Sequence, residues 1–134
     1  MRFIPISTGF LALFALAVVE GKSVPAKKVV DLAEGKKVFE VNCVACHGAS
    51  GKGDGAAAVA LTPKPRDFTD AAYMKTRPVD TLRMVIAEGG QSVGLSPVMV
   101  GWKASLTPVQ IESVLQYVLT FSKPSKAAGA KKAK

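Results

Sequence analysis

The sequence predicts a small all-α domain in which three principal helices are joined by long loops. Three segments carry apolar residues at helical spacing, and no segment alternates with a period of two for long enough to predict a strand. The connecting segments are rich in glycine and proline and are long for a domain of this size. Loops of that length are unusual in a small domain unless they wrap something, so we expect them to surround a bound group.

The first predicted helix covers residues 31–42. Its apolar side repeats at helical spacing through Leu32, Gly35, Phe39 and Cys43. Asp31 is placed to cap the N-terminus, because a carboxylate accepts hydrogen bonds from the free N–H groups of the first turn. Residues 48–70 follow as a loop marked by glycine and proline.

A short turn over residues 70–75 precedes the second predicted helix. Pro78 suits the first helical position, and the pair Gly89-Gly90 ends the helix after about Glu88. The apolar side of this helix consists of Leu82, Val85 and Ile86.

The third predicted helix has the clearest boundary signals. Thr107 can cap it, Pro108 fits the first helical position, and Gln110 completes a capping box. An apolar stripe at helical spacing follows, formed by Ile111, Val114, Leu115, Val118 and Phe121.

Residues 1–26 are predicted to be a signal peptide. Met1-Arg2 gives a positive start, and Phe10–Val19 is an apolar run of ten residues. Small residues that suit cleavage follow near Gly21 and Ala26, so cleavage after residue 21 is an alternative. Ten helical residues span about 15 Å, against a hydrocarbon core of roughly 30 Å. A cleaved signal is therefore favoured over an uncleaved membrane anchor.

The basic charge of the chain is concentrated in its last residues. The net charge is +8, but residues 123–134 hold five lysines and no acid, whereas residues 27–122 hold eleven Lys or Arg and nine Asp or Glu. The pattern lacks the folded basic face that nucleic-acid binding requires, so nucleic acid is excluded as a partner. We expect residues 27–122 to form the domain and residues 123–134 to be a disordered Lys/Ala-rich tail. The tail is either simply solvated or transiently contacts an acidic partner or an anionic membrane.

Both cysteines and the single histidine of the chain fall within five positions, in Cys43-Val44-Ala45-Cys46-His47. This pattern is typical of covalent attachment of c-type haem. Each thiol adds to a haem vinyl group to form a thioether, and the two-residue spacer lets both sulfurs lie along one haem edge. The pattern predicts one covalently bound haem c, attached to Cys43 and Cys46, with His47 as the proximal axial ligand of the iron.

Two other kinds of site use closely spaced cysteines. A redox dithiol opens a helix that follows a strand, whereas this pair closes a predicted helix and no predicted strand precedes it. A closed zinc site needs four ligands, and the chain has no further Cys or His to complete one. Haem attachment is favoured over both.

The second axial ligand of the iron cannot be histidine, because the chain has only one. Methionine sulfur is the natural alternative, and it raises the reduction potential. Met84 falls in the second predicted helix and Met74 in the turn before it, where methionine usually fills gaps in the core. Met99 lies in an irregular segment, from which sulfur can point at the iron. We therefore favour Met99 as the distal ligand over Met74 and Met84.

Several short motifs lie between residues 43 and 118. They are Cys-Val-Ala-Cys-His-Gly (43–48), Gly-Lys-Gly-Asp-Gly (51–55), Pro-Lys-Pro-Arg-Asp-Phe (63–68), Ser-Pro-Val-Met (96–99), Trp102 and Gln-Tyr-Val (116–118). On these motifs residues 31–122 resemble a class I c-type cytochrome, of the monohaem, His/Met-ligated, bacterial periplasmic type. The resemblance implies the small cytochrome c fold around one haem, with His47 and Met99 on the two axial sides of the iron.

The resemblance also implies a crossing of the first and last helices. Gly35 and Phe39 match the first-helix contact of the family. Val114 and Tyr117 match the last-helix residues that cross it. Many relatives have proline directly after the ligand methionine, where this chain has Val100, so a less rigid ligand loop is expected.

Two sets of residues are candidates for polar contacts to the haem site. In relatives a proline carbonyl accepts a hydrogen bond from the outer nitrogen of the ligand histidine, and Pro63 or Pro65 is placed for that role. Arg66 and Trp102 are candidates for hydrogen bonds to the haem propionates, with ordinary packing as the alternative.

These expectations lead to a one-electron carrier and not to an enzyme, because a haem with both axial positions filled leaves no place for substrate. We expect a monomeric periplasmic protein that shuttles electrons between redox partner proteins, membrane-tethered if its N-terminus is not cleaved. One alternative is a haem subunit or domain of a membrane-bound redox complex. Another is a haem sensor or enzyme with a displaceable sixth ligand.

Overall fold

The computed structural model describes residues 30–123, so the predicted signal peptide and nearly all of the predicted tail lie outside the described residues. Within that range the regular elements are helices joined by loops, and one isolated antiparallel bridge pairs Gly89 with Val100. The helices, with η for 3₁₀, are α1 (Leu32–Asn42), α2 (Val44–His47), η1 (Ala56–Ala60), α3 (Ala71–Lys75), α4 (Val79–Glu88), η2 (Gly90–Val93) and α5 (Pro108–Phe121). The predicted all-α class is confirmed, with α1, α4 and α5 as the principal helices.

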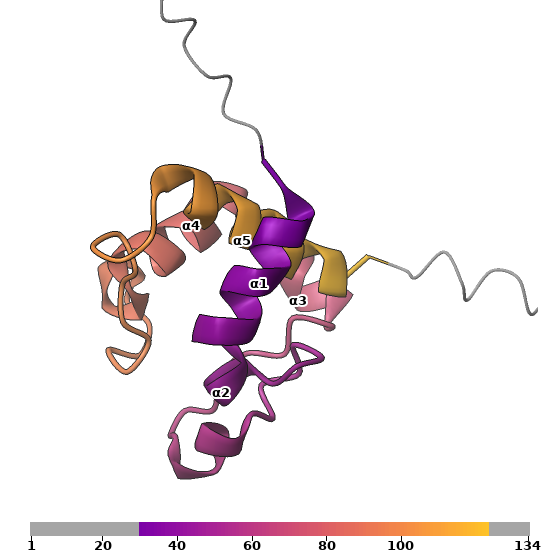
Figure 1. Cartoon of the computed structure of the whole chain (residues 1–134). Helices are drawn as coiled ribbons and strands as arrows, with labels where there is room; N and C mark the ends of the chain where they lie inside the picture. The colour runs from indigo at the N-terminus through magenta and orange to yellow at the C-terminus, as the bar shows by residue number, and fades with distance from the viewer. Residues whose placement is uncertain (1–29, 124–134) are drawn as a thin grey trace, which may run out of the picture.

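Helices α1 and α5 cross at the centre of the molecule (Figure 1). A Cβ atom on Gly35 would lie 2.1 Å from the backbone oxygen of Ser113, so the two helix backbones touch where the glycine stands. Beside this contact the ring of Phe39 packs 5.5 Å from the ring of Tyr117. Phe39 and Val114 are both 1% exposed, which places the core at this crossing.

The starts of both crossing helices are capped by side chains. Asp31 Oδ1 accepts a hydrogen bond from the N–H of Ala33 at 2.8 Å, and the N–H of Asp31 donates to Ser113 Oγ at 3.2 Å. At the start of α5 the N–H of Gln110 donates to Thr107 Oγ1 at 3.3 Å, and the N–H of Thr107 donates to Gln110 Oε1 at 3.1 Å. The predicted cap of α1 and the predicted capping box of α5 are both formed.

Helix α4 begins one residue later than the sequence predicts. Pro78 has φ −58° and an extended ψ of 136°, so it precedes the helix instead of occupying its first position. Pro78 is the N-cap, its side chain makes no capping hydrogen bond, and the first helical hydrogen bond runs from Leu82 N–H to the Pro78 oxygen at 3.1 Å. The predicted end is correct, because Gly89 follows the helix with φ +91°.

Three short helices lie in segments predicted as loop or turn. η1 interrupts the 48–70 loop at an alanine-rich run, and η2 follows α4 directly. The turn expected over residues 70–75 is the helix α3, in which Asp70 Oδ1 accepts a hydrogen bond from Tyr73 N–H at 3.0 Å.

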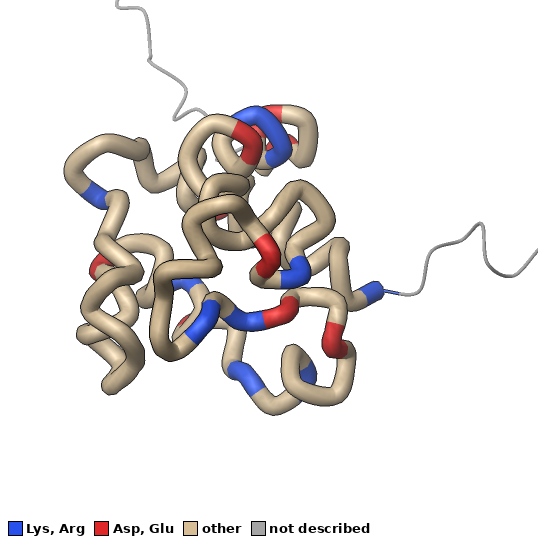
Figure 2. The backbone as a smooth tube through the Cα atoms, turned by 90° about the horizontal axis from the view of Figure 1, so that it is seen from below, with Lys and Arg blue, Asp and Glu red and all other residues tan. Residues whose placement is uncertain are grey.

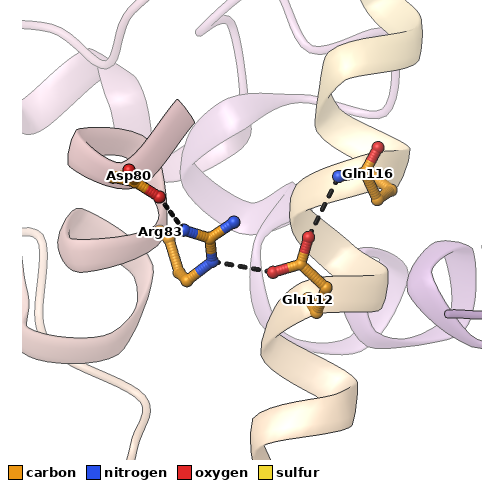
Figure 3. A network of polar contacts seen from close by, with 4 residues as sticks. All are labelled: Asp80, Arg83, Glu112 and Gln116. Atoms are coloured by element: carbon orange, nitrogen blue, oxygen red, sulfur yellow. Dashed lines mark hydrogen bonds and ion pairs between the residues drawn. The ribbon is translucent and has the colours of Figure 1, made fainter. Parts of the chain in front are cut away.

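Charged residues of both signs are interspersed along the described backbone (Figure 2). One ionic contact joins α4 to α5, because Arg83 Nε lies 2.7 Å from Glu112 Oε2 (Figure 3). Arg83 also pairs with Asp80 on its own helix, and Gln116 donates to Glu112 Oε1 at 3.0 Å. This network fixes the side of α4 that faces α5.

Candidate haem site

A single turn of helix positions the attachment motif. Cys43 ends α1 with φ −117°, and its N–H still donates to the Phe39 oxygen at 2.9 Å. α2 starts at the next residue, and the N–H of His47 donates to the Cys43 oxygen at 2.9 Å. Cys43, Cys46 and His47 therefore belong to one compact piece of backbone at the end of α1.

The glycine-rich segment 51–55 wraps the carbonyl end of this turn. The N–H of Gly53 donates to the His47 oxygen at 2.8 Å, and the N–H of Gly55 donates to the Cys46 oxygen at 3.2 Å. Gly53 has φ +73°, and a Cβ there would lie 2.3 Å from the Pro65 oxygen. This close approach requires glycine, and it makes the segment a tight connection that holds the motif.

One cavity brings the attachment motif together with Met99. Cys43, Cys46, His47 and Met99 all line it. The rest of the lining is largely apolar and includes Leu82, Val85, Ile86, Leu106, Val114 and Val118. α1, α4 and α5 thus converge on a space with apolar walls and a few polar groups, which is typical of a cofactor site.

The imidazole of His47 is held in a form that can bind a metal. Burial lowers the pKa of His47 below its usual value, so the ring is neutral at neutral pH, as a ligand must be. The ring stacks on Phe68, with 4.6 Å between the ring centres and 17° between the planes. Phe68 was not singled out from the sequence, although it ends the 63–68 motif.

The outer nitrogen of His47 does not make the predicted hydrogen bond to a proline carbonyl. His47 Nδ1 is buried and has no hydrogen-bond partner among the described residues, so neither Pro63 nor Pro65 accepts from it here. Both prolines line the same cavity as the imidazole. A buried imidazole nitrogen without a partner is costly, and ligating histidines usually donate a hydrogen bond from this nitrogen to a carbonyl or carboxylate.

Both cysteines are free and half-buried. Burial raises the pKa of the Cys43 thiol to about 11, and the neighbouring Cys46 sulfur adds to the effect. In residues 30–123 no group of three or more His, Cys, Asp or Glu side chains could hold a metal ion directly, so the zinc alternative finds no ligand set there. Two free thiols beside a neutral imidazole fit covalently bound haem.

The segment that carries Met99 is fixed to the end of α4. The N–H of Gly90 donates to the Met99 oxygen at 2.8 Å, and the N–H of Trp102 donates to the Ile86 oxygen at 2.9 Å. Val100, which follows Met99 where many relatives have proline, forms the bridge to Gly89. These backbone contacts tie down both sides of the segment.

The three internal methionines have different surroundings. Met99 is half-buried and lines the cavity. Met74 also lines it but is 5% exposed and belongs to the core cluster. Met84 is 47% exposed and is not among the lining residues. Among the described residues, the structure thus places two methionines, Met74 and Met99, at the wall of this cavity.

The sequence profile of the family described as "Cytochrome c" matches residues 32–122. The chain belongs to the cytochrome c family. Curated relatives of this cytochrome include the Cbb3-type cytochrome c oxidase subunit FixP of Bradyrhizobium diazoefficiens, 32% identical over 94 residues. FixP of Bradyrhizobium sp. strain ORS 278 is 31% identical over 94 residues. Each alignment covers 70% of this chain and 29% of the relative, so the chain spans less than a third of their length.

Solved structures share the fold of this cytochrome. The KustC0563 c-type cytochrome has a TM-score of 0.52 at 27% identity, covering 66% of this chain and 98% of that one. The Kuenenia stuttgartiensis reducing HAO-like protein complex Kustc0457/Kustc0458 has a TM-score of 0.54 at 29% identity, covering 71% of this chain and 44% of that one. The expectation of a class I c-type cytochrome with the small cytochrome c fold is confirmed.

Family membership establishes the cofactor and the kind of chemistry. The cofactor of a cytochrome c domain is covalently bound haem c with its iron, and its role is electron transfer. Such domains are of an extracytoplasmic type. No helix within residues 30–123 is long and apolar enough to cross a membrane.

Proposed function

We propose that this cytochrome carries one electron at a time on a single haem c attached to Cys43 and Cys46, with His47 and Met99 as axial ligands of the iron. The observation that carries the proposal is that one cavity is lined by all four residues, although Met99 lies far along the chain from the attachment motif. Haem c, when bound, supplies an iron that alternates between the ferric and ferrous states.

The chain's own residues would set how that iron behaves. His47 is neutral and stacked on Phe68, so it offers a fixed ring nitrogen. Apolar side chains of α4 and α5 exclude water from the cavity, which raises the reduction potential together with a thioether ligand. With His47 and Met99 both bound, no position is left for substrate, and we therefore propose a carrier and not an enzyme.

Substitution of Met99 tests the ligand set. In haem-loaded protein, Met99→Ala should open the sixth position, lower the reduction potential and allow rapid binding of carbon monoxide or cyanide. Met74→Leu is the matched control, because Met74 lines the same cavity but belongs to the core cluster. An unchanged spectrum and potential in Met99→Ala would overturn this assignment, and a changed ligand set in Met74→Leu would transfer it to Met74.

Substitution of Cys43 tests the attachment. Cys43→Ala should leave at most one thioether, so the yield of haem-loaded protein should fall and the spectrum of the denatured protein should change. Normal covalent haem content in that variant would contradict the proposed attachment points.

A second candidate is a haem domain of a membrane-bound redox complex. It is favoured by the two FixP relatives, which are oxidase subunits about three times as long as the matched segment. We propose that residues 1–26 are cleaved and that the product is a monomeric periplasmic carrier between redox partner proteins. Mass spectrometry of the mature N-terminus and membrane fractionation distinguish the two, because an intact N-terminus in the membrane fraction identifies a tethered domain.

A haem sensor or enzyme with a displaceable sixth ligand is the remaining candidate. Rapid binding of carbon monoxide or cyanide to the unsubstituted protein would favour it over the carrier.

For residues 123–134 we propose transient contact with an acidic partner or an anionic membrane. Electron-transfer rates measured against salt concentration, with and without these residues, test that contact, because screening weakens it.

A further inference from the structure

The haem cavity has a cationic part that none of the proposed iron ligands or attachment residues uses. Lys64, Arg66 and Arg77 line the cavity, and no Asp or Glu is among its lining residues. Lys64 and Arg66 are exposed to solvent, whereas Arg77 is half-buried, and a buried cation is costly without a partner of opposite charge. Haem brings two propionate groups, which are anionic at neutral pH. A bound haem would therefore supply the negative charge that the cavity lining lacks.

Arg77 is the cation whose surroundings most require an acceptor. Its Nε is buried and has no hydrogen-bond partner within the described part of the chain. Its guanidinium carbon lies 4.6 Å from the centre of the Tyr73 ring, a contact that holds the group in place without accepting its hydrogens. The ion pairs found in residues 30–123 do not include Arg77.

Arg66 also stacks on the Tyr73 ring, but acidic residues lie near it. Its guanidinium carbon lies 5.1 Å from the centre of the Tyr73 ring. Arg66 also lines a separate surface depression together with Asp67 and Asp70, which do not line the haem cavity. Arg77 does not line that depression. Of the two arginines, it is therefore the one that lines the haem cavity alone.

We propose that Arg77, stacked on Tyr73, is a positioning residue that binds a haem propionate through its guanidinium group, with Arg66 as a second cation beside it. A guanidinium donates two parallel hydrogen bonds to one carboxylate, and its Nε supplies one of them. This inference rests on haem occupying the cavity and not on Met99 as the distal ligand.

The charge of Arg77 should be visible in the redox equilibrium of the iron. A propionate without its cation leaves negative charge that stabilises the ferric, more positive state of the haem. Removing Arg77 should therefore lower the reduction potential. Lysine at this position keeps the charge but loses the planar fork and its stacking on Tyr73, so it should restore only part of the effect.

The experiment compares Arg77→Met, Arg77→Lys and Lys75→Met in haem-loaded full-length protein by redox titration. Lys75 is the control because it lies on the neighbouring α3, is exposed and does not line the cavity. Arg77→Met should move the ferric-to-ferrous ratio at a fixed potential about tenfold toward ferric, equivalent to about 59 mV for one electron. Arg77→Lys should move it less, and Lys75→Met by less than about twofold.

Equal shifts in Arg77→Met and Lys75→Met would overturn the proposal. The absorption spectrum reports the axial ligands, and it should stay the same in all three variants. A wrong assignment of Met99 would already show in the spectrum of the unsubstituted protein, so the two failures can be told apart. If Arg77→Met does not load haem, the comparison of Tyr73→Leu with Tyr73→Phe decides. Tyr73→Leu removes the aromatic platform and should lower the potential, whereas Tyr73→Phe keeps it and should not; equal potentials would overturn the proposal.

Discussion

The backbone oxygen of Ser113 lies 2.1 Å from the point that a Cβ atom on Gly35 would occupy. The side chain of the same serine is fully buried, and its hydroxyl accepts a hydrogen bond from the N–H of Asp31 at 3.2 Å. α1 is therefore tied to α5 by a polar contact at its N-terminal end and a backbone contact one turn later. Because the attachment motif follows directly after α1, this crossing also fixes where the motif stands.

Gly35→Ala should destabilise the protein despite the higher helix propensity of alanine. The added Cβ meets backbone on α5, so the helices must separate, and overpacking of this kind costs roughly 1–3 kcal/mol. The gain in propensity recovers at most about 1 kcal/mol. We expect a net loss of about 1–2 kcal/mol in the free energy of unfolding of haem-loaded protein, measured with guanidinium chloride. Lys37→Ala, an exposed substitution on α1, should change it by less than about 0.5 kcal/mol. Equal stability of the two variants would contradict the close contact.

The fold could be predicted where its signals are local. The caps at Asp31 and Thr107 are formed by residues two or three positions away, and both predicted helix starts are correct. The short helices η1 and η2 depend on contacts from other segments. For example, Gly55, which precedes η1, is held by a hydrogen bond to the Cys46 oxygen. Such contacts leave no periodic pattern in the sequence.

Thr107→Ala should cost about 1 kcal/mol of unfolding free energy. The substitution removes the hydroxyl that accepts the N–H of Gln110 at 3.3 Å, so one free N–H of the first turn of α5 loses its partner. Thr107→Ser keeps the hydroxyl and should stay within about 0.5 kcal/mol of the unsubstituted protein. Denaturant unfolding followed by far-ultraviolet circular dichroism gives both values. A loss in Thr107→Ser as large as in Thr107→Ala would show that the hydroxyl does not cap.

The ion pair between Arg83 and Glu112 joins two helices (Figure 3), and it should contribute measurably because both side chains are partly shielded from solvent. The Arg83 side chain is 38% exposed and the Glu112 side chain 21% exposed. We expect a double-mutant cycle with Arg83→Met and Glu112→Gln to give a coupling of about 0.5–1 kcal/mol that falls with added salt. The same cycle with Asp80→Asn should give less, since the Asp80 side chain is 90% exposed. A larger coupling to Asp80 than to Glu112 would contradict this ranking.

In the candidate site, as in the fold, features set by neighbouring residues can be predicted from the sequence, and features set by distant contacts cannot. The attachment residues and His47 lie in one contiguous motif, so their chemistry can be predicted from spacing alone. Arg77 belongs to none of the recognised motifs. Its position in the cavity follows from the path of the chain between α3 and α4. Phe68 lies within a recognised motif, yet its stacking on His47 depends on a loop held by the hydrogen bond from its N–H to the Gly51 oxygen at 2.7 Å.

Gly90→Ala should loosen the proposed distal ligand without touching it. A Cβ on Gly90 would lie 2.4 Å from the Ser96 oxygen, so the segment that carries Met99 would have to shift. If the shift weakens the iron–sulfur bond by about 1.4 kcal/mol, the open form becomes about tenfold more populated, and cyanide should bind about tenfold faster.

Gly94→Ala is the matched control in the same loop. Gly94 has φ +74°, so alanine there is strained and should cost about 1 kcal/mol of stability. Nothing lies within 4 Å of its added Cβ, however, so cyanide binding should stay slow. The two variants separate general destabilisation of the loop from displacement of the ligand segment. Equal acceleration in both would mean that cyanide entry follows loop stability alone and that the contact between Gly90 and Ser96 does not hold Met99 in place.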